Sequence, residues 1–70
     1  MKGFRRVGAH EVIVQERVLH QCIVEIRDGQ VVNYYEFEDE VPMTEWLGGT
    51  ILLRQEEGVL HAYWNETLID

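Results

Sequence analysis

The chain has 70 residues and a mass of 8.3 kDa, which leaves room for one domain, residues 1–70, with one small core. Hydrophobic residues make up 46% and charged residues 27%, a composition typical of folded domains. Thirteen acidic against six basic residues give a formal net charge of -7, which argues against nucleic acid and anionic membranes as partners. No apolar run approaches the ~18 residues that a membrane-spanning helix needs.

The charges are unevenly distributed along the chain. Four of the six basic residues lie near the N-terminus: Lys2, Arg5, Arg6 and Arg17. Five acidic residues gather in the middle: Glu36, Glu38, Asp39, Glu40 and Glu45. The simplest interpretation is a solvated face that keeps the protein soluble. The alternative is complementarity between the basic N-terminal strand and the acidic segment, within one chain or between chains.

The cysteine content and the N-terminal residues bear on the cellular compartment. Cys22 is the only cysteine, so no intrachain disulfide can form. The first residues lack the apolar stretch of a signal peptide. We therefore expect a cytoplasmic protein.

Residues 4–14 are expected to form one bent strand or two short ones, with Gly8 as the bend. Residues 18–27 and 30–38 follow as a hairpin around Asp28-Gly29, because this dipeptide suits a type I′ turn in which both residues have positive φ. A two-residue loop predicts four facing pairs: Ile26 with Val31, Val24 with Asn33, Cys22 with Tyr35, and His20 with Phe37.

The first hairpin has one apolar face of period two, which contains His20 and Cys22. Leu19 and Ile23 break this pattern, because they fall on the polar face and need cover there. After the hairpin, Pro42 argues against a central strand. Thr44 to Trp46 is expected to form one helical turn, ended by Gly48-Gly49.

A second hairpin is expected over residues 50–55 and 59–65, with Gly58 providing positive φ in the loop. A two-residue loop would place Arg54 opposite His61. Both faces of this hairpin carry apolar residues, so the outer face needs cover, from residues 41–47 or from another chain. The predicted fold is all-β: five or six short antiparallel strands in a meander, closed as a small barrel or folded as a two-layer sandwich.

Two segments carry a resemblance to a known family. Residues 24–32, V-E-I-R-D-G-Q-V-V, resemble the hairpin of the small β domain that flanks the barrel in amidohydrolase-type metal-dependent hydrolases. Residues 46–51, W-L-G-G-T-I, are similar to the later return of that domain. The metal-binding H-x-H of the family does not follow, so the resemblance implies only a β domain of similar architecture. The chain also resembles short bacterial proteins without an assigned function.

Residues able to carry chemistry are few. His20 and Cys22, two apart on one strand, are the candidate metal ligands, but a structural zinc site needs four ligands and Cys22 has no second cysteine beside it. The core interpretation, with Cys22 as a small apolar residue, is therefore preferred. His10 and Glu11 should face opposite sides of a strand. The sequence has no serine and no nucleophile motif. No catalytic residue, cofactor or metal is expected.

The aromatic residues suggest how the domain could act. Tyr34, Trp46 and Tyr63 are candidates for a partner surface, because Trp and Tyr favour interfaces. For Trp46, however, the preferred interpretation is a buried plug across the open end of a small barrel, and the exposed patch is the alternative. The expected function is a non-enzymatic interaction or accessory module; the alternative is a protein that binds a small ligand or metal through His20, Cys22 and nearby aromatics. Because so short a chain has a thin stability margin, we expect a homo-oligomer, most simply a two-fold dimer.

Overall fold

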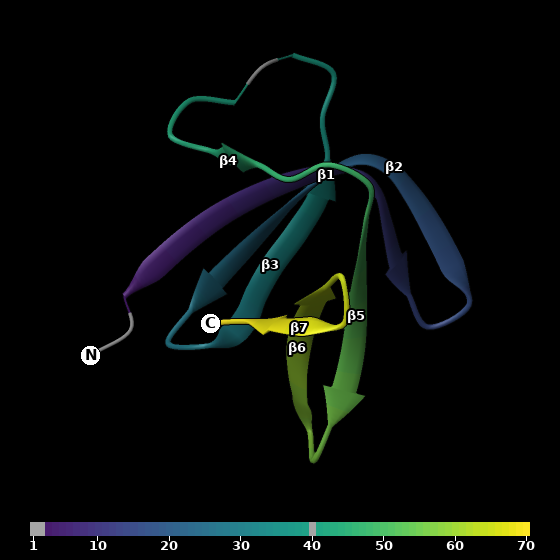
Figure 1. The fold of residues 1–70 in the computed structure, drawn as a ribbon, viewed down its shortest axis with the longest axis vertical. Coiled ribbons are helices and arrows are strands. Elements are labelled where there is room, and N and C mark those ends of the chain that lie inside the picture. The colour runs from purple at the N-terminus through teal and green to yellow at the C-terminus, as the bar shows by residue number, and fades with distance from the viewer. Residues whose placement is uncertain (1–2, 40) are drawn as a thin grey trace.

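The computed structural model describes residues 3–39 and 41–70 and confirms the all-β class. The described residues form seven strands: β1 (Phe4–Val14), β2 (Arg17–Arg27), β3 (Gln30–Glu36), β4 (Glu45–Trp46), β5 (Thr50–Glu56), β6 (Val59–Trp64) and β7 (Thr67–Ile69). Figure 1 shows their arrangement. No helix in this part of the chain is long and apolar enough to cross a membrane.

The strands form one sheet in the order β3-β2-β1-β5-β6-β7, with β4 beside β1. The pairs β1–β2, β2–β3, β5–β6 and β6–β7 are antiparallel, but β1 pairs in parallel with both β4 and β5. The predicted meander of five or six antiparallel strands is therefore wrong at this point. Because β2 occupies one edge of β1, the chain after β3 crosses to the free edge and enters it in the parallel direction.

The long β1–β2 hairpin bends at its middle, as Figure 1 shows at the top of the view. At the bend, the spacing between buried residues changes from two positions to three: Val12 follows Ala9 on β1, and Cys22 follows Leu19 on β2. Gln21 has φ +51°, a left-handed conformation within a strand. Beyond this bend the sheet folds back, so that β3 contacts β6. The result is a two-layered, open sheet and not a closed barrel.

One core lies between the two layers. It contains apolar side chains from β1, β2, β5, β6 and β7: Val7, Ala9, Val12, Val14, Leu19, Cys22, Val24, Ile26, Ile51, Leu53, Ala62 and Ile69. Leu19 belongs to it because of the change in spacing at the bend, so it needs no cover on a polar face. Ile23 does lie on the outer face, as predicted, and is 1% exposed there because Trp46 covers it. Within residues 41–47, Trp46 thus covers the first hairpin at Ile23.

Both predicted hairpin turns are confirmed. Asp28 and Gly29 have φ +52° and +81°, and Ile26 pairs with Val31. The pairs further along β3 are shifted by one residue, because a β-bulge at Val32 interrupts the ladder and places Val24 opposite Tyr34.

In the second hairpin, Glu57 and Gly58 have φ +53° and +81°, and Arg54 pairs with His61. The predicted helical turn at residues 44–46 is wrong. Glu45 and Trp46 form β4, which is held where the Leu47 N–H donates to the Gly8 carbonyl at 2.7 Å.

Candidate functional site

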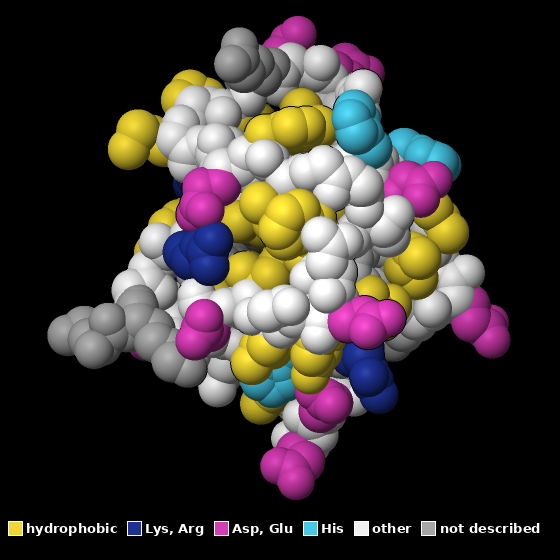
Figure 2. Space-filling view, in the orientation of Figure 1, with side chains coloured by type: hydrophobic (Ala, Val, Ile, Leu, Met, Phe, Trp, Pro, Cys, Tyr) yellow, Lys and Arg dark blue, Asp and Glu magenta, His cyan; other side chains and the backbone are white. Residues whose placement is uncertain are grey.

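A groove of about 330 Å³ lies under the segment that joins β3 to β4. Its described lining comes from β2, β4 and the joining segment: Gln21, Ile23, Phe37, Glu38, Val41, Thr44 and Trp46. Figure 2 shows hydrophobic and acidic side chains gathered on this segment at the top of the view. Glu38 is the one charged residue in the described lining, so the groove combines an apolar wall with a carboxylate at its rim.

Trp46 forms the wall of this groove and is held in place by a glycine. A Cβ atom on Gly8 would lie 2.9 Å from the Trp46 ring, so the indole packs directly on the β1 backbone. The rings of His10 and Phe37 meet that of Trp46 edge to face, with centroids 5.1 and 5.9 Å away. Trp46 nevertheless remains 49% exposed. It is therefore neither a barrel plug nor a free side chain, but a fixed aromatic surface.

The bend of β2 shapes the other end of the groove. The Gln21 carbonyl accepts a hydrogen bond from the Phe37 N–H at 2.9 Å, which is the last backbone bond before the chain leaves the sheet. The Glu36 carboxylate then accepts the His20 N–H at 3.2 Å. These bonds direct Phe37 and Glu38 over the groove. Glu40 belongs to the acidic cluster but lies outside the described residues.

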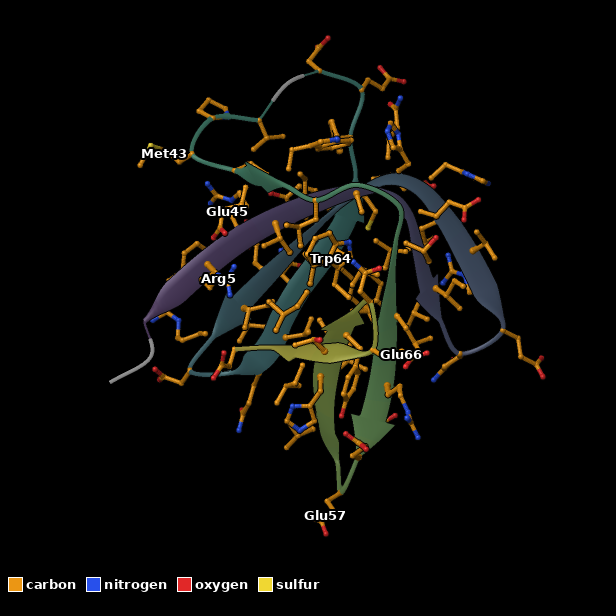
Figure 3. All side chains as sticks on the ribbon, in the orientation of Figure 1. Arg5, Met43, Glu45, Glu57, Trp64 and Glu66 are labelled. Carbon is orange, nitrogen blue, oxygen red and sulfur yellow. The ribbon has the colours of Figure 1, made fainter. Side chains whose placement is uncertain are left out.

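An ion pair ties β4 to β1. The Arg5 guanidinium donates to both carboxylate oxygens of Glu45, at 2.7 and 3.0 Å, and the two side chains meet in Figure 3. This hydrogen bond lowers the pKa of Glu45 and raises the pKa of Arg5. The predicted complementarity between the basic N-terminal strand and the acidic segment is thus confirmed within one chain for this pair. Lys2 lies outside the described residues.

A second polar cluster stiffens the sheet beside the groove. The Glu25 carboxylate of β2 accepts hydrogen bonds from Arg6 of β1 and from the Tyr35 hydroxyl of β3, both at 3.0 Å. Burial raises the pKa of Glu25, but the hydrogen bonds from Arg6, Tyr35 and Asn33, together with the positive charge of Arg6, leave that pKa below its usual value. Burial and the bond to Glu25 raise the pKa of Tyr35. The cluster joins three strands on the face that carries Trp46.

The structure does not bring His20 and Cys22 together. Cys22 is fully buried in the core, whereas His20 is exposed beyond the bend at Gln21. Burial raises the pKa of the Cys22 thiol to about 11. Within residues 3–39 and 41–70, no group of three or more His, Cys, Asp or Glu side chains is placed to hold a metal ion.

The bend also overturns the prediction that His10 and Glu11 face opposite sides. Both are exposed, and together with His20 they line one shallow depression beside β5.

The three aromatic candidates for a partner surface are also separated. Tyr34 packs against the core, and Tyr63 lies on the outer face of β6, where its hydroxyl donates to Glu56 at 2.8 Å. Only Trp46 lines the groove. Sequence reasoning missed Phe37 and Gln21 as its neighbours. The three-residue step from Leu19 to Cys22, in a strand otherwise of period two, was the available signal for the bend that places them.

No family model, curated protein or solved structure matches the chain.

Proposed function

We propose that the protein is a non-enzymatic interaction module that holds, in the Trp46 groove, a peptide with a large apolar side chain next to Lys or Arg. The observation that supports this proposal is the half-exposed Trp46, fixed on Gly8 and facing an acidic rim. Fixed aromatic side chains make strong contacts at interfaces because little conformational freedom is lost when a partner binds.

The size and charge of the groove select the partner chemistry. About 330 Å³ is at the small end of binding pockets, enough for one large side chain rather than for an extended ligand. Glu38 lies at the rim, with Glu36 and Asp39 beside it in the chain, and the net charge is -7. Such a field attracts cationic segments and repels acidic ones.

A binding experiment with defined peptides tests the proposal. The probe is acetyl-Lys-Lys-Leu-Lys-Lys-amide, and the readout is the chemical shift of the two tryptophan indole N–H groups during titration. The Trp64 indole donates to the Gly48 carbonyl at 2.6 Å, so it serves as an internal reference away from the groove lining. We expect a saturable shift of the Trp46 signal, a weaker response when alanine replaces the leucine, and none when glutamate replaces the lysines.

Two variants of equal charge separate the groove from general electrostatics. Glu38→Gln removes a rim carboxylate, while Glu57→Gln removes one at the far tip of the β5–β6 hairpin, as Figure 3 shows. We expect Glu38→Gln to weaken binding about two- to fivefold, because a rim charge contributes ~0.5–1 kcal/mol. Glu57→Gln should leave it unchanged. Equal weakening by both variants, or an unmoved Trp46 signal with the leucine peptide, would contradict the proposal.

A further inference from the structure

A second apolar surface lies on the outer face of the other layer, away from the groove. Five apolar side chains form a row across five neighbouring strands: Val18 (β2), Ile13 (β1), Leu52 (β5), Tyr63 (β6) and Leu68 (β7). Each is the direct register partner of the next. Directly paired residues point to the same face of a sheet, so this row is continuous.

The row is on the solvent side of the sheet. The residues next to it along the strands, such as Val12, Ile51 and Ala62, are buried in the core. By alternation the row faces outward, and Val18, Leu52 and Leu68 are 50%, 38% and 42% exposed. A solvated sheet face normally carries polar side chains. A contiguous apolar row therefore indicates a surface that is covered by a partner.

Charges on either side of the row are complementary to each other. On one side lies Glu11, whose carboxylate accepts only the Thr50 hydroxyl, at 3.1 Å, among its described contacts. On the other side lies Arg54, two residues from Leu52 on the same strand, with its guanidinium 5.7 Å from the Tyr63 ring centre. Neither forms an ion pair with another described residue.

We propose that a second copy of this chain covers the row. The two-fold axis runs parallel to the row, between the sheet of one copy and the sheet of the other. That rotation places Leu52 over Leu52 of the second copy and turns the Glu11 side of one copy toward the Arg54 side of the other. Glu11 lies on β1 and Arg54 on β5, and these neighbouring strands are ~5 Å apart. After the rotation, Glu11 of one copy is therefore displaced sideways from Arg54 of the second copy by only one strand spacing, which brings each carboxylate within reach of a guanidinium. Both charge pairs form at once, because a two-fold interface uses the same patch twice.

The small area of the surface argues for a weak dimer. Five strands ~4.8 Å apart and three residue rows ~7 Å apart give about 500 Å² per copy. This is below the ~800 Å² of a standard interface, so the dimer should be weak, with a dissociation constant in the micromolar range. The surface shares no residue with the groove lining, so self-association and peptide binding can fail independently.

Sedimentation velocity from low micromolar to near-millimolar protein tests the dimer. We expect the wild-type protein to shift with concentration from 8.3 kDa toward twice that mass. Leu52→Asp should remain monomeric throughout, since two carboxylates would face each other at the axis. Val32→Asp makes the same change at a residue on β3 that is 55% exposed and outside the row, and it should associate like the wild type.

A charge exchange tests the orientation and does not depend on how Leu52→Asp folds. Glu11→Arg alone should weaken association at least threefold, because it sets two arginines against each other. The double variant Glu11→Arg/Arg54→Glu should restore it. A wild-type protein that stays at 8.3 kDa at every concentration, a double variant no better than the single one, or equal loss in Val32→Asp would overturn the proposal.

Discussion

Gly29 holds a left-handed backbone conformation in the turn of the first hairpin. It has φ +81°, is buried, and its carbonyl accepts a hydrogen bond from His61 Nδ1 at 3.2 Å. This bond joins the β2–β3 turn to β6 across the open side of the sheet. A glycine here therefore allows the type I′ turn, in which both central residues have positive φ.

We expect Gly29→Val to lower the free energy of unfolding by ~1–2 kcal/mol, because a β-branched residue is strained at positive φ. Gln30→Val is the matched control, since it introduces the same side chain at the next, exposed position of β3. Chemical denaturation of both variants gives the comparison. Equal midpoints would show that residue 29 does not hold the turn in a left-handed conformation.

At the scale of single elements, the two hairpin turns could be predicted because Asp28-Gly29 and Gly58 carry their conformation in the residue type. The β6–β7 turn was missed, since Asn65 and Glu66 reach φ +52° and +64° without a glycine. The bend of β2 was missed for the same reason: a glutamine at φ +51° is selected by the folding of the whole hairpin and not by its own preference. The groove depends on that bend, so its lining could not be predicted locally.

The attachment of β4 can be tested at Gly8. Gly8→Ala places a methyl group 2.9 Å from the Trp46 ring and 3.1 Å from Ile23 Cδ1, so the indole must move off the sheet. We expect a loss of ~1 kcal/mol in stability, typical of mild overpacking, and weaker binding of the leucine peptide. Gly48→Ala is the control, because a Cβ there meets nothing within 4 Å. The indole N–H shift of Trp46 reports the movement; an unchanged shift in Gly8→Ala would mean that the glycine does not fix the ring.

For the molecule as a whole, composition and period-two patterning were sufficient to predict an all-β domain, because few other structures bury such a sequence. Strand order was not predictable in this way. Whether the chain after β3 pairs with the free edge of β3, as in a meander, or crosses to β1 depends on where Trp46 meets the bare backbone of Gly8. These long-range contacts leave the sheet open, because β3 packs against β6 and does not pair with it.

The stability of the fold should fall at acidic pH because of two carboxylates. Glu25 and Glu45 have pKa values below the usual 4.5 in the folded chain, through hydrogen bonds from Arg6, Tyr35 and Arg5 that exceed the opposing effect of burial. A lowered folded pKa stabilises the fold above about pH 4.5 and loses this contribution as the pH falls toward the folded value. Glu25→Gln should therefore flatten the decline of the urea midpoint below this pH.

The alkaline side of the profile should also decline, for the opposite reason. Burial raises the pKa of Cys22 from 9.0 to about 11, so the folded state favours the neutral thiol. A raised pKa of an acidic group contributes full stability below the unfolded value and loses it as the pH rises toward the folded one. We therefore expect the urea midpoint to fall between about pH 9 and 11, and to fall less in Cys22→Ala, although the cavity lowers its midpoint at every pH. Parallel alkaline declines in the two proteins would show that the thiol is not held neutral by the core, and that the decline comes from Tyr35 and Tyr63, whose pKa values are also raised.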